Sequence, residues 1–248
     1  MTLHEYILDQ VFMETLSAHA LAALAEFESE ESERLERFKA LSEEADADFT
    51  RRSHLSIDDF KEDWQLSQFW YSDATANILA DELLDGADNE TIICIASAPS
   101  VYAAIRAREP SELPTKNIYL LEFDRRFEIL SGTKYFGFFD YNQPLNVPEH
   151  LKGRCHRLLI DPPFLETDCQ RKSAHAAKTL LHPDKTQKTK ENKLRYKLIT
   201  CTGERMADVV TSHYPDVHVT TFYPEHKNGL SNEFRCYASF EGKSWKFA

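Results

Sequence analysis

The chain has 248 residues, a formal net charge of −12 and a hydrophobic content of 42%, which is enough for a sizeable core. Its longest apolar runs are strand-sized, whereas a membrane-spanning helix needs roughly 20 residues. Five widely spaced cysteines without a CxxC pair suit a reducing compartment and offer no metal framework, and the first residues lack a secretory signal. We expect a cytoplasmic protein with no membrane partner and no metal.

The negative charge is concentrated at the N-terminus. Residues 1–63 hold 17 acidic and 6 basic side chains, whereas residues 64–248 hold 24 and 23. Tight binding to a nucleic-acid backbone requires clustered Lys and Arg, so an acidic arm is better suited to a basic protein partner. Apolar spacing over 14–41 predicts a helix, which is either solvated with a weak apolar stripe or a dock for a partner. Residues 42–59 follow as a polar linker.

From residue 60 onward, strands and helices alternate. The expected helices are 72–84, 99–108, 168–181 and 204–213, and the expected strands are 91–96, 117–123, 135–141, 157–163, 196–203, 217–224 and 233–240. The last two strands predict an antiparallel hairpin. The chain thus divides into an acidic helical arm with its linker (1–59) and one α/β sheet of about seven strands (60–248).

The stretch "HRLLIDPPFLE" (156–166) ends a buried strand abruptly. Residues 158–160 are apolar, as in parallel sheets, but Pro162 and Pro163 have no amide hydrogen to donate to a neighbouring strand. Because a proline follows, Asp161 is pushed into extended backbone. Ligands bind at the carboxyl ends of strands in open α/β sheets, so this stiff turn is a candidate site. A strand exit without chemistry is the alternative.

The turn Asp161-Pro162-Pro163-Phe164 resembles the (Asp/Asn)-Pro-Pro-(Phe/Tyr) motif of amino-directed methyltransferases, in which it also follows the fourth strand. The strand order resembles the seven-stranded class I methyltransferases, a Rossmann-like fold. Longer stretches resemble the N6-adenine-methyltransferase-like family, whose best-described members are fungal and human elongation factor 1-alpha lysine methyltransferases. These stretches are 16–27, 64–83, 97–102, 120–127, 138–148 and 232–237.

The resemblance implies an S-adenosylmethionine-dependent protein-lysine N-methyltransferase that acts on translation elongation factor 1-alpha, with no nucleic-acid partner; we expect a monomer. Two alternatives stay open: a nucleic-acid adenine N6-methyltransferase, and a non-catalytic methyltransferase-fold binding module. An enzyme of duplex DNA must flip its base and usually carries a recognition domain, for which this chain has little room.

The loop after the first strand, "IASAPS" (95–100), contains no glycine. Class I methyltransferases normally place a Gly-rich loop here, which lets the backbone approach the cofactor. Within the family that the chain resembles, the glycine-free loop is the expected one. Ser97 and Ala98 are small enough for close approach, and the resemblance implies that they contact the cofactor.

An acidic residue at the end of the second strand usually accepts hydrogen bonds from both ribose hydroxyls of the cofactor. We favour Glu122, which directly follows "YLL", over Asp124. The alternative role is a surface salt bridge with Arg125 or Arg126.

Two further segments are expected beside the cofactor. Asp140 ends the third strand, where it can accept from the adenine amino group with Tyr141 against the ring, or else simply precede a turn. Tyr71 and Ser72 are the expected contacts at the methionine end. They close an aromatic cluster with Trp64, Phe69 and Trp70, although such clusters are more often core than site.

Asp161, Pro162 and Phe164 are the expected catalytic residues, and Asp161 also borders the cofactor. A carboxylate and a proline carbonyl can accept both N–H groups of an amine and leave its lone pair aimed at the methyl group, an orientation effect worth several kcal/mol. Phe164 would stack on a base, or attract an ammonium by roughly 0.5–2 kcal/mol. Lysine must lose its proton first, since its pKa is about 10.4. Asp161 alone therefore does not distinguish lysine from adenine.

The run "DKTQKTKENKLRYK" (184–197) contains six basic residues. A solvated loop is the favoured interpretation. Nucleic-acid binding and a surface for an acidic patch of a substrate are the alternatives.

Overall fold

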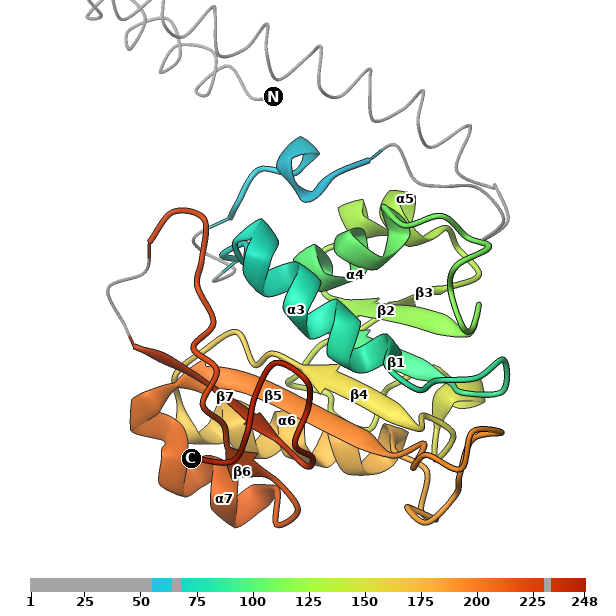
Figure 1. Ribbon diagram of the computed structural model, residues 1–248. Helices are drawn as coiled ribbons and strands as arrows, with labels where there is room; N and C mark the ends of the chain where they lie inside the picture. Colours follow the sequence, from blue (N-terminus) through green and yellow to red (C-terminus); the bar gives the residue numbers. More distant parts are fainter. Residues whose placement is uncertain (1–54, 64–67, 230–232) are drawn as a thin grey trace, which may run out of the picture. The chain divides into compact units, whose positions relative to one another are not determined.

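Seven strands form one mixed sheet in the order β3-β2-β1-β4-β5-β7-β6 (Figure 1). The computed structural model describes residues 55–63, 68–229 and 233–248. The strands are β1 (Ile93–Ala96), β2 (Ile118–Glu122), β3 (Phe136–Phe138), β4 (Arg157–Ile160), β5 (Lys197–Gly203), β6 (His218–Val219) and β7 (Phe234–Ala238). The predicted seven-stranded α/β sheet is confirmed, although β3 and β6 are shorter than expected and β4 ends at Ile160, before the two prolines.

Strand direction brings the predicted site residues together. Strands β3, β2, β1, β4 and β5 run parallel, so their carboxyl ends meet at one edge. Strand β7 lies between β5 and β6 and is antiparallel to both. Its pairing with β6 is the antiparallel hairpin that the sequence predicts. All four residues of β1 and of β4 are buried, which explains why both strands are continuously apolar or nearly so.

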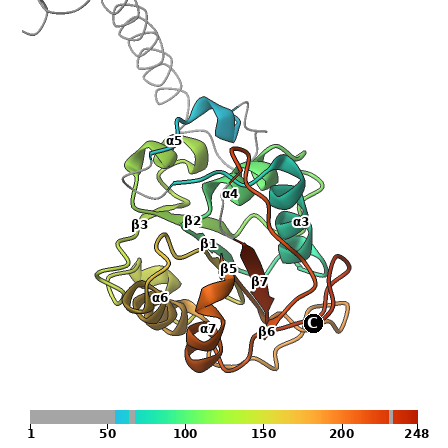
Figure 2. The ribbon, with the colours of Figure 1, turned by 90° about the vertical axis from the view of Figure 1, so that its left-hand side faces the viewer.

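Helices cover both faces of the sheet (Figure 2). Helices α3 (Asp73–Leu84) and α4 (Pro99–Arg106) pack on one face, and α6 (Thr167–Leu180) and α7 (Ala207–His213) on the other. The short α5 (Glu128–Ser131) precedes β3. Short 3-10 helices span Ile57–Asp59, Arg125–Phe127, Glu149–Leu151 and Glu204–Met206. Within the described ranges, none of the helices is both long and apolar enough to cross a bilayer.

The end of the predicted linker is structured. Leu55, Ile57 and Phe60 are buried, and Ser56 closes a capping box with Asp59 around the first 3-10 helix. The predicted helix 14–41 lies outside the described residues, and the predicted domain boundary after residue 59 stays a prediction.

Several bases of the run 184–197 pair with acidic side chains of the same fold. Arg195 contacts Asp88 at 2.9 Å and Glu90 at 2.6 Å, and Lys185 forms an ion pair with Asp216. The run is thus a loop that leads into β5, which begins at Lys197. The ion pairs leave Arg195 and Lys185 less available to a nucleic-acid backbone.

The carboxyl end of α3 is held by two buried basic side chains. The last carbonyls of a helix lack partners within it. Arg157 of β4 donates to the carbonyls of Leu83 at 2.5 Å and Asp85 at 2.9 Å, and Lys197 of β5 donates to that of Glu82 at 2.6 Å. The helix is therefore tied to the two strands on which it lies.

Replacing Arg157 with Met should lower the free energy of unfolding by about 2–4 kcal/mol, because buried carbonyls lose their donors. Arg108→Met is the matched control: Arg108 pairs with the exposed Asp81, and losing such a surface pair costs about 1 kcal/mol or less. Urea unfolding of both variants measures the difference. Equal stability of the two variants would contradict this anchoring role.

Candidate active site

A cavity of about 480 Å³ lies at the carboxyl ends of the parallel strands. Residues that follow four successive strands line it: Ser97 and Ala98 after β1, Glu122 and Phe123 from β2, Asp140 and Tyr141 after β3, and Asp161, Pro162 and Phe164 after β4. The structure thus brings together most of the predicted site residues. Tyr71 and Ser72 do not line the cavity.

The glycine-free loop adopts the backbone that glycine usually provides. Ser97 has a φ of 59°, in the left-handed region that L-residues rarely occupy. Its N–H donates to the Leu121 carbonyl at 2.9 Å, and Ala98 then caps α4. The loop therefore makes the sharp turn expected of a cofactor loop with a serine in place of glycine.

Glu122 is the carboxylate at the end of β2 that faces the cavity. Its Oε1 accepts hydrogen bonds from the N–H groups of Phe123 at 2.8 Å and Asp124 at 3.4 Å. Burial raises the pKa of Glu122 to about 7, although these bonds and their partial positive charge oppose the shift. A hydroxyl donor from a ligand would favour its ionised form.

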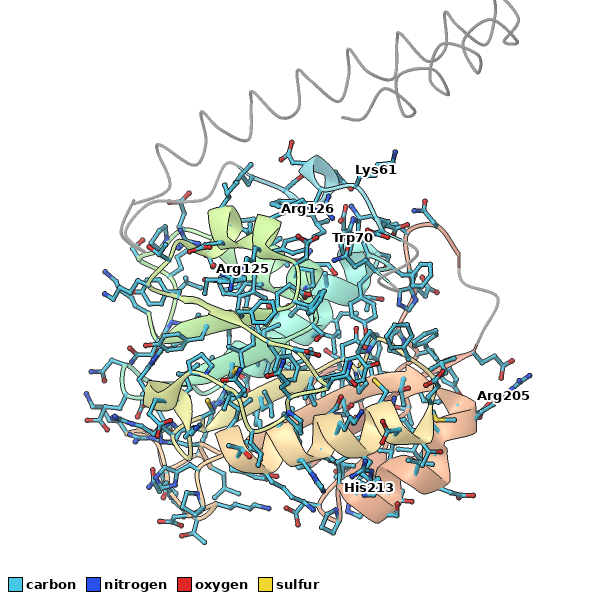
Figure 3. The ribbon with its side chains drawn as sticks, turned by 180° about the vertical axis from the view of Figure 1, so that it is seen from behind. Lys61, Trp70, Arg125, Arg126, Arg205 and His213 are labelled. Carbon is cyan, nitrogen blue, oxygen red and sulfur yellow. The ribbon has the colours of Figure 1, made fainter. Side chains whose placement is uncertain are left out.

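Asp124 has a different role. Its carboxylate pairs with Arg126 at 2.5 Å and accepts from the Gln68 side chain at 3.1 Å. Asp124 thus forms the alternative that the sequence left open for these two acids, a salt bridge with a following arginine. Gln68 lies just before the Trp70–Tyr71 segment, so its contact with Asp124 also holds the chain that leads to Tyr71. Figure 3 shows Trp70, Arg125 and Arg126 on one side of the sheet and Arg205 and His213 on the other.

Asp140 both lines the cavity and closes a turn. Its Oδ1 accepts from the Asn142 N–H at 2.8 Å, and Oδ2 from the Gln143 side chain at 3.2 Å. The neighbouring Tyr141 ring meets the Phe164 ring edge-on at 5.7 Å between centroids. This pair of rings joins the end of β3 to the turn after β4.

Asp161 is held by Tyr71. The Tyr71 hydroxyl donates to Asp161 Oδ2 at 2.7 Å, and the Asp161 N–H donates to the Ala96 carbonyl of β1 at 3.0 Å. Burial raises the pKa of Asp161 to about 7, and the Tyr71 hydrogen bond opposes that shift. Tyr71 thus acts behind the cavity wall, on the carboxylate that faces the cavity.

Ser72 and the other aromatic residues have separate positions. Ser72 caps α3 by accepting from the Thr75 N–H at 3.2 Å. Phe69 and Trp70 line the cavity, and Trp70 also packs edge-on against Phe127 in the core. Trp64 lies outside the described residues.

Gln170 of α6 holds the Asp161–Phe164 turn by hydrogen bonding. Its side-chain amide donates to the Phe164 carbonyl at 3.3 Å and to Thr202 Oγ1 at 3.0 Å, and it is fully buried. Gln170 was not predicted as a site residue. Its burial could have been predicted, since it stands on the same helix face as the small residues Ala174 and Ala177, but its contact with the turn could not.

Two rings from the C-terminal part of the chain were also not predicted as site residues. His226 and Phe234 both line the cavity, and their ring centroids lie 4.6 Å apart. Burial lowers the pKa of His226 to about 4. Phe234 lies within the stretch 232–237 that carried the family resemblance, whereas no local pattern marks His226.

Known proteins resemble this chain over most of its length. The profile of a family described as "Probable N6-adenine methyltransferase" matches residues 62–242. The chain is 58% identical to protein-lysine N-methyltransferase EFM5 of Saccharomyces cerevisiae, covering 94% of this chain and 95% of that protein. It is 37% identical to EEF1A lysine methyltransferase 1 of Gallus gallus and of Homo sapiens, covering 91% of this chain and 93% and 92% of theirs.

Substitutions at Ser97 test the strained loop. Ser97→Gly should be as stable as the wild type or up to about 1 kcal/mol more stable, because glycine adopts a positive φ without strain. Ser97→Val should lose about 1–3 kcal/mol, since a β-branched residue is strongly disfavoured there. Urea unfolding measures both, and a valine variant as stable as the glycine variant would contradict the conformation.

Proposed function

The chain belongs to the N6-adenine-methyltransferase-like family, and we propose that it is an S-adenosylmethionine-dependent protein-lysine N-methyltransferase whose substrate is elongation factor 1-alpha. The observation that carries the chemistry is the turn after β4, which places Asp161 and Phe164 together in the cavity. The substrate rests on the relatives, which are named lysine methyltransferases at 37–58% identity. They favour lysine over adenine and over a role limited to binding.

The cavity fits the cofactor. Glu122 offers a buried carboxylate for the ribose hydroxyls, Asp140 an acceptor for the adenine amino group, and Ser97 with Ala98 a backbone that a ligand can approach closely. When bound, S-adenosylmethionine supplies an electrophilic methyl group on a positively charged sulfur. The two carboxyls in the cavity whose pKa values burial raises to about 7, Glu122 and Asp161, are favoured in their ionised form by a nearby positive charge.

The turn after β4 orients the target amine. The Asp161 carboxylate and the Pro162 carbonyl accept the two N–H groups of a neutral lysine amine, and the lone pair then points in one direction. Tyr71 keeps the carboxylate in place and favours its ionised form by donating to Oδ2. Phe164, set by its contacts with Tyr141 and Gln170, packs against the incoming side chain.

Three narrower expectations remain predictions: a monomer, a cytoplasmic location, and the absence of a nucleic-acid partner. The pairing of Arg195 and Lys185 with acids of the same fold supports the last. The orientation of the target amine depends on none of these three expectations.

A transfer assay tests the proposed function. Wild type and Asp161→Ala are incubated with radiolabelled S-adenosylmethionine and an extract of cells that lack this protein, and label is counted in protein and in nucleic acid. We expect one labelled protein band at the size of elongation factor 1-alpha, reduced by about 100-fold or more in the variant, because the amine loses its orientation. Asp168→Ala is the matched control, since Asp168 is exposed on α6 and pairs with Arg171.

The outcomes separate the alternatives. Label in nucleic acid would overturn the substrate while keeping the chemistry. No label from folded wild-type protein, with no cofactor binding by calorimetry, would support the non-catalytic binding module.

A further inference from the structure

Three rings and a carboxylate contact one another in succession at the wall of the cavity. The Tyr71 hydroxyl donates to Asp161, and the Tyr71 ring lies against the His226 ring with centroids 4.8 Å apart. Backbone pairing sets this contact, because Tyr71 and His226 form an antiparallel bridge. The His226 ring in turn meets the Phe234 ring edge-on at 4.6 Å.

Further contacts lead from Phe234 back to the Asp161–Phe164 turn. Phe234 is the register partner of Gly203, the last residue of β5. A Cβ built on Gly203 would lie only 3.0 Å from Leu165 Cδ2, so Leu165 packs against a backbone without a side chain. Leu165 directly follows the turn that begins with Asp161, so the contacts lead back to the turn from which they start.

We propose that the target lysine side chain reaches the reacting centre through a ring of contacting residues, and that His226 and Phe234 form its specificity-determining wall. We call this ring the collar; its members are Tyr71, Asp161, Leu165, Gly203, His226 and Phe234. The inference rests on the proposed function. Four members of the collar, namely Asp161, Leu165, His226 and Phe234, line the cavity itself. The other two hold them in place from behind.

The chemistry of the wall suits a lysine side chain. The faces of His226 and Phe234 and the side chain of Leu165 offer apolar surface to the aliphatic stem, and aromatic faces also attract an ammonium group. Because burial lowers the pKa of His226 to about 4, its ring is uncharged at neutral pH and does not repel a cation. The carboxylate of Asp161 stands at the inner end, where the amine is needed.

The collar also explains the glycine at the end of β5. A side chain at position 203 would press Leu165 toward the other members, and the channel would narrow. We therefore assign Gly203 to the site although it does not itself line the cavity.

Steady-state kinetics test the collar. Transfer to purified elongation factor 1-alpha is measured at saturating S-adenosylmethionine for wild type, His226→Ala and Phe234→Ala, and the Kd of the cofactor is measured by calorimetry. Each truncation should raise KM for the protein substrate about tenfold, since one aromatic contact is lost. The cofactor Kd should stay within a factor of about two, because the wall touches only the target side chain.

Two further variants isolate the ring and its charge. His226→Phe keeps an uncharged ring and should retain a KM near that of the wild type, whereas His226→Lys should be worse than His226→Ala because it repels the substrate amine. His175→Ala is the matched control, since His175 is exposed on α6 and does not line the cavity. If the truncations unfold, Gly203→Ala tests the same channel from behind: its KM for the protein substrate should rise while the cofactor Kd stays unchanged, and an unchanged KM would overturn the collar.

The outcomes are distinguishable. An active wild type with unchanged KM in His226→Ala and Phe234→Ala would overturn the collar alone. A cofactor Kd that rises as much as KM would place the two rings against the cofactor and overturn it too. A wild type that transfers no methyl group to lysine would overturn the proposed function and this inference with it.

Discussion

The hydrogen bond from the Tyr71 hydroxyl to Asp161 joins the two halves of the site. Asp161 directly follows the buried parallel strand β4, and Tyr71 directly precedes the cap of α3. That helix has 12 residues, about 18 Å at 1.5 Å per residue, and its far end is held by Arg157 and Lys197 from β4 and β5. The position of the hydroxyl thus depends on contacts made at the opposite edge of the sheet.

Burial gives the cavity its electrostatic character. Glu122 and Asp161 both have a pKa raised to about 7, in each case chiefly because the carboxyl is removed from water. Backbone N–H groups oppose the shift at Glu122, and a phenol opposes it at Asp161. Two such carboxyls in one cavity favour a cationic ligand, which agrees with a sulfonium cofactor and an amine substrate.

Local signals were enough to predict much of this arrangement. Pro162 and Pro163 cannot donate a backbone hydrogen bond to a neighbouring strand, so the position of Asp161 at the end of a buried strand followed from its neighbours. Sequence alone could not separate Glu122 from Asp124, because the two lie two residues apart at the end of β2. In the structure Glu122 lines the cavity, whereas Asp124 contacts Arg126 and Gln68. Tyr71 was predicted beside the cofactor, but the structure places it behind Asp161.

His226 and Gln170 could not be predicted in the same way. His226 reaches the cavity through a bridge to Tyr71, a pairing between distant parts of the chain that no local period encodes. Gln170 acts through a hydrogen bond to the Phe164 carbonyl, which depends on how α6 packs under the turn. Sequence patterns show which strand ends bear chemistry, whereas long-range packing decides which side chains support it.

Tyr71 favours the ionised form of the carboxylate that orients the amine, and the measurement that we would make first is the pH dependence of kcat/KM in wild type and Tyr71→Phe. The pKa of Asp161 is already raised to about 7 by burial, and the Tyr71 hydrogen bond lowers it. Since the carboxylate is the active form, removing the hydroxyl should move the rising limb to higher pH. A rising limb that stays in place, or moves to lower pH, would contradict this role of the Tyr71 hydroxyl.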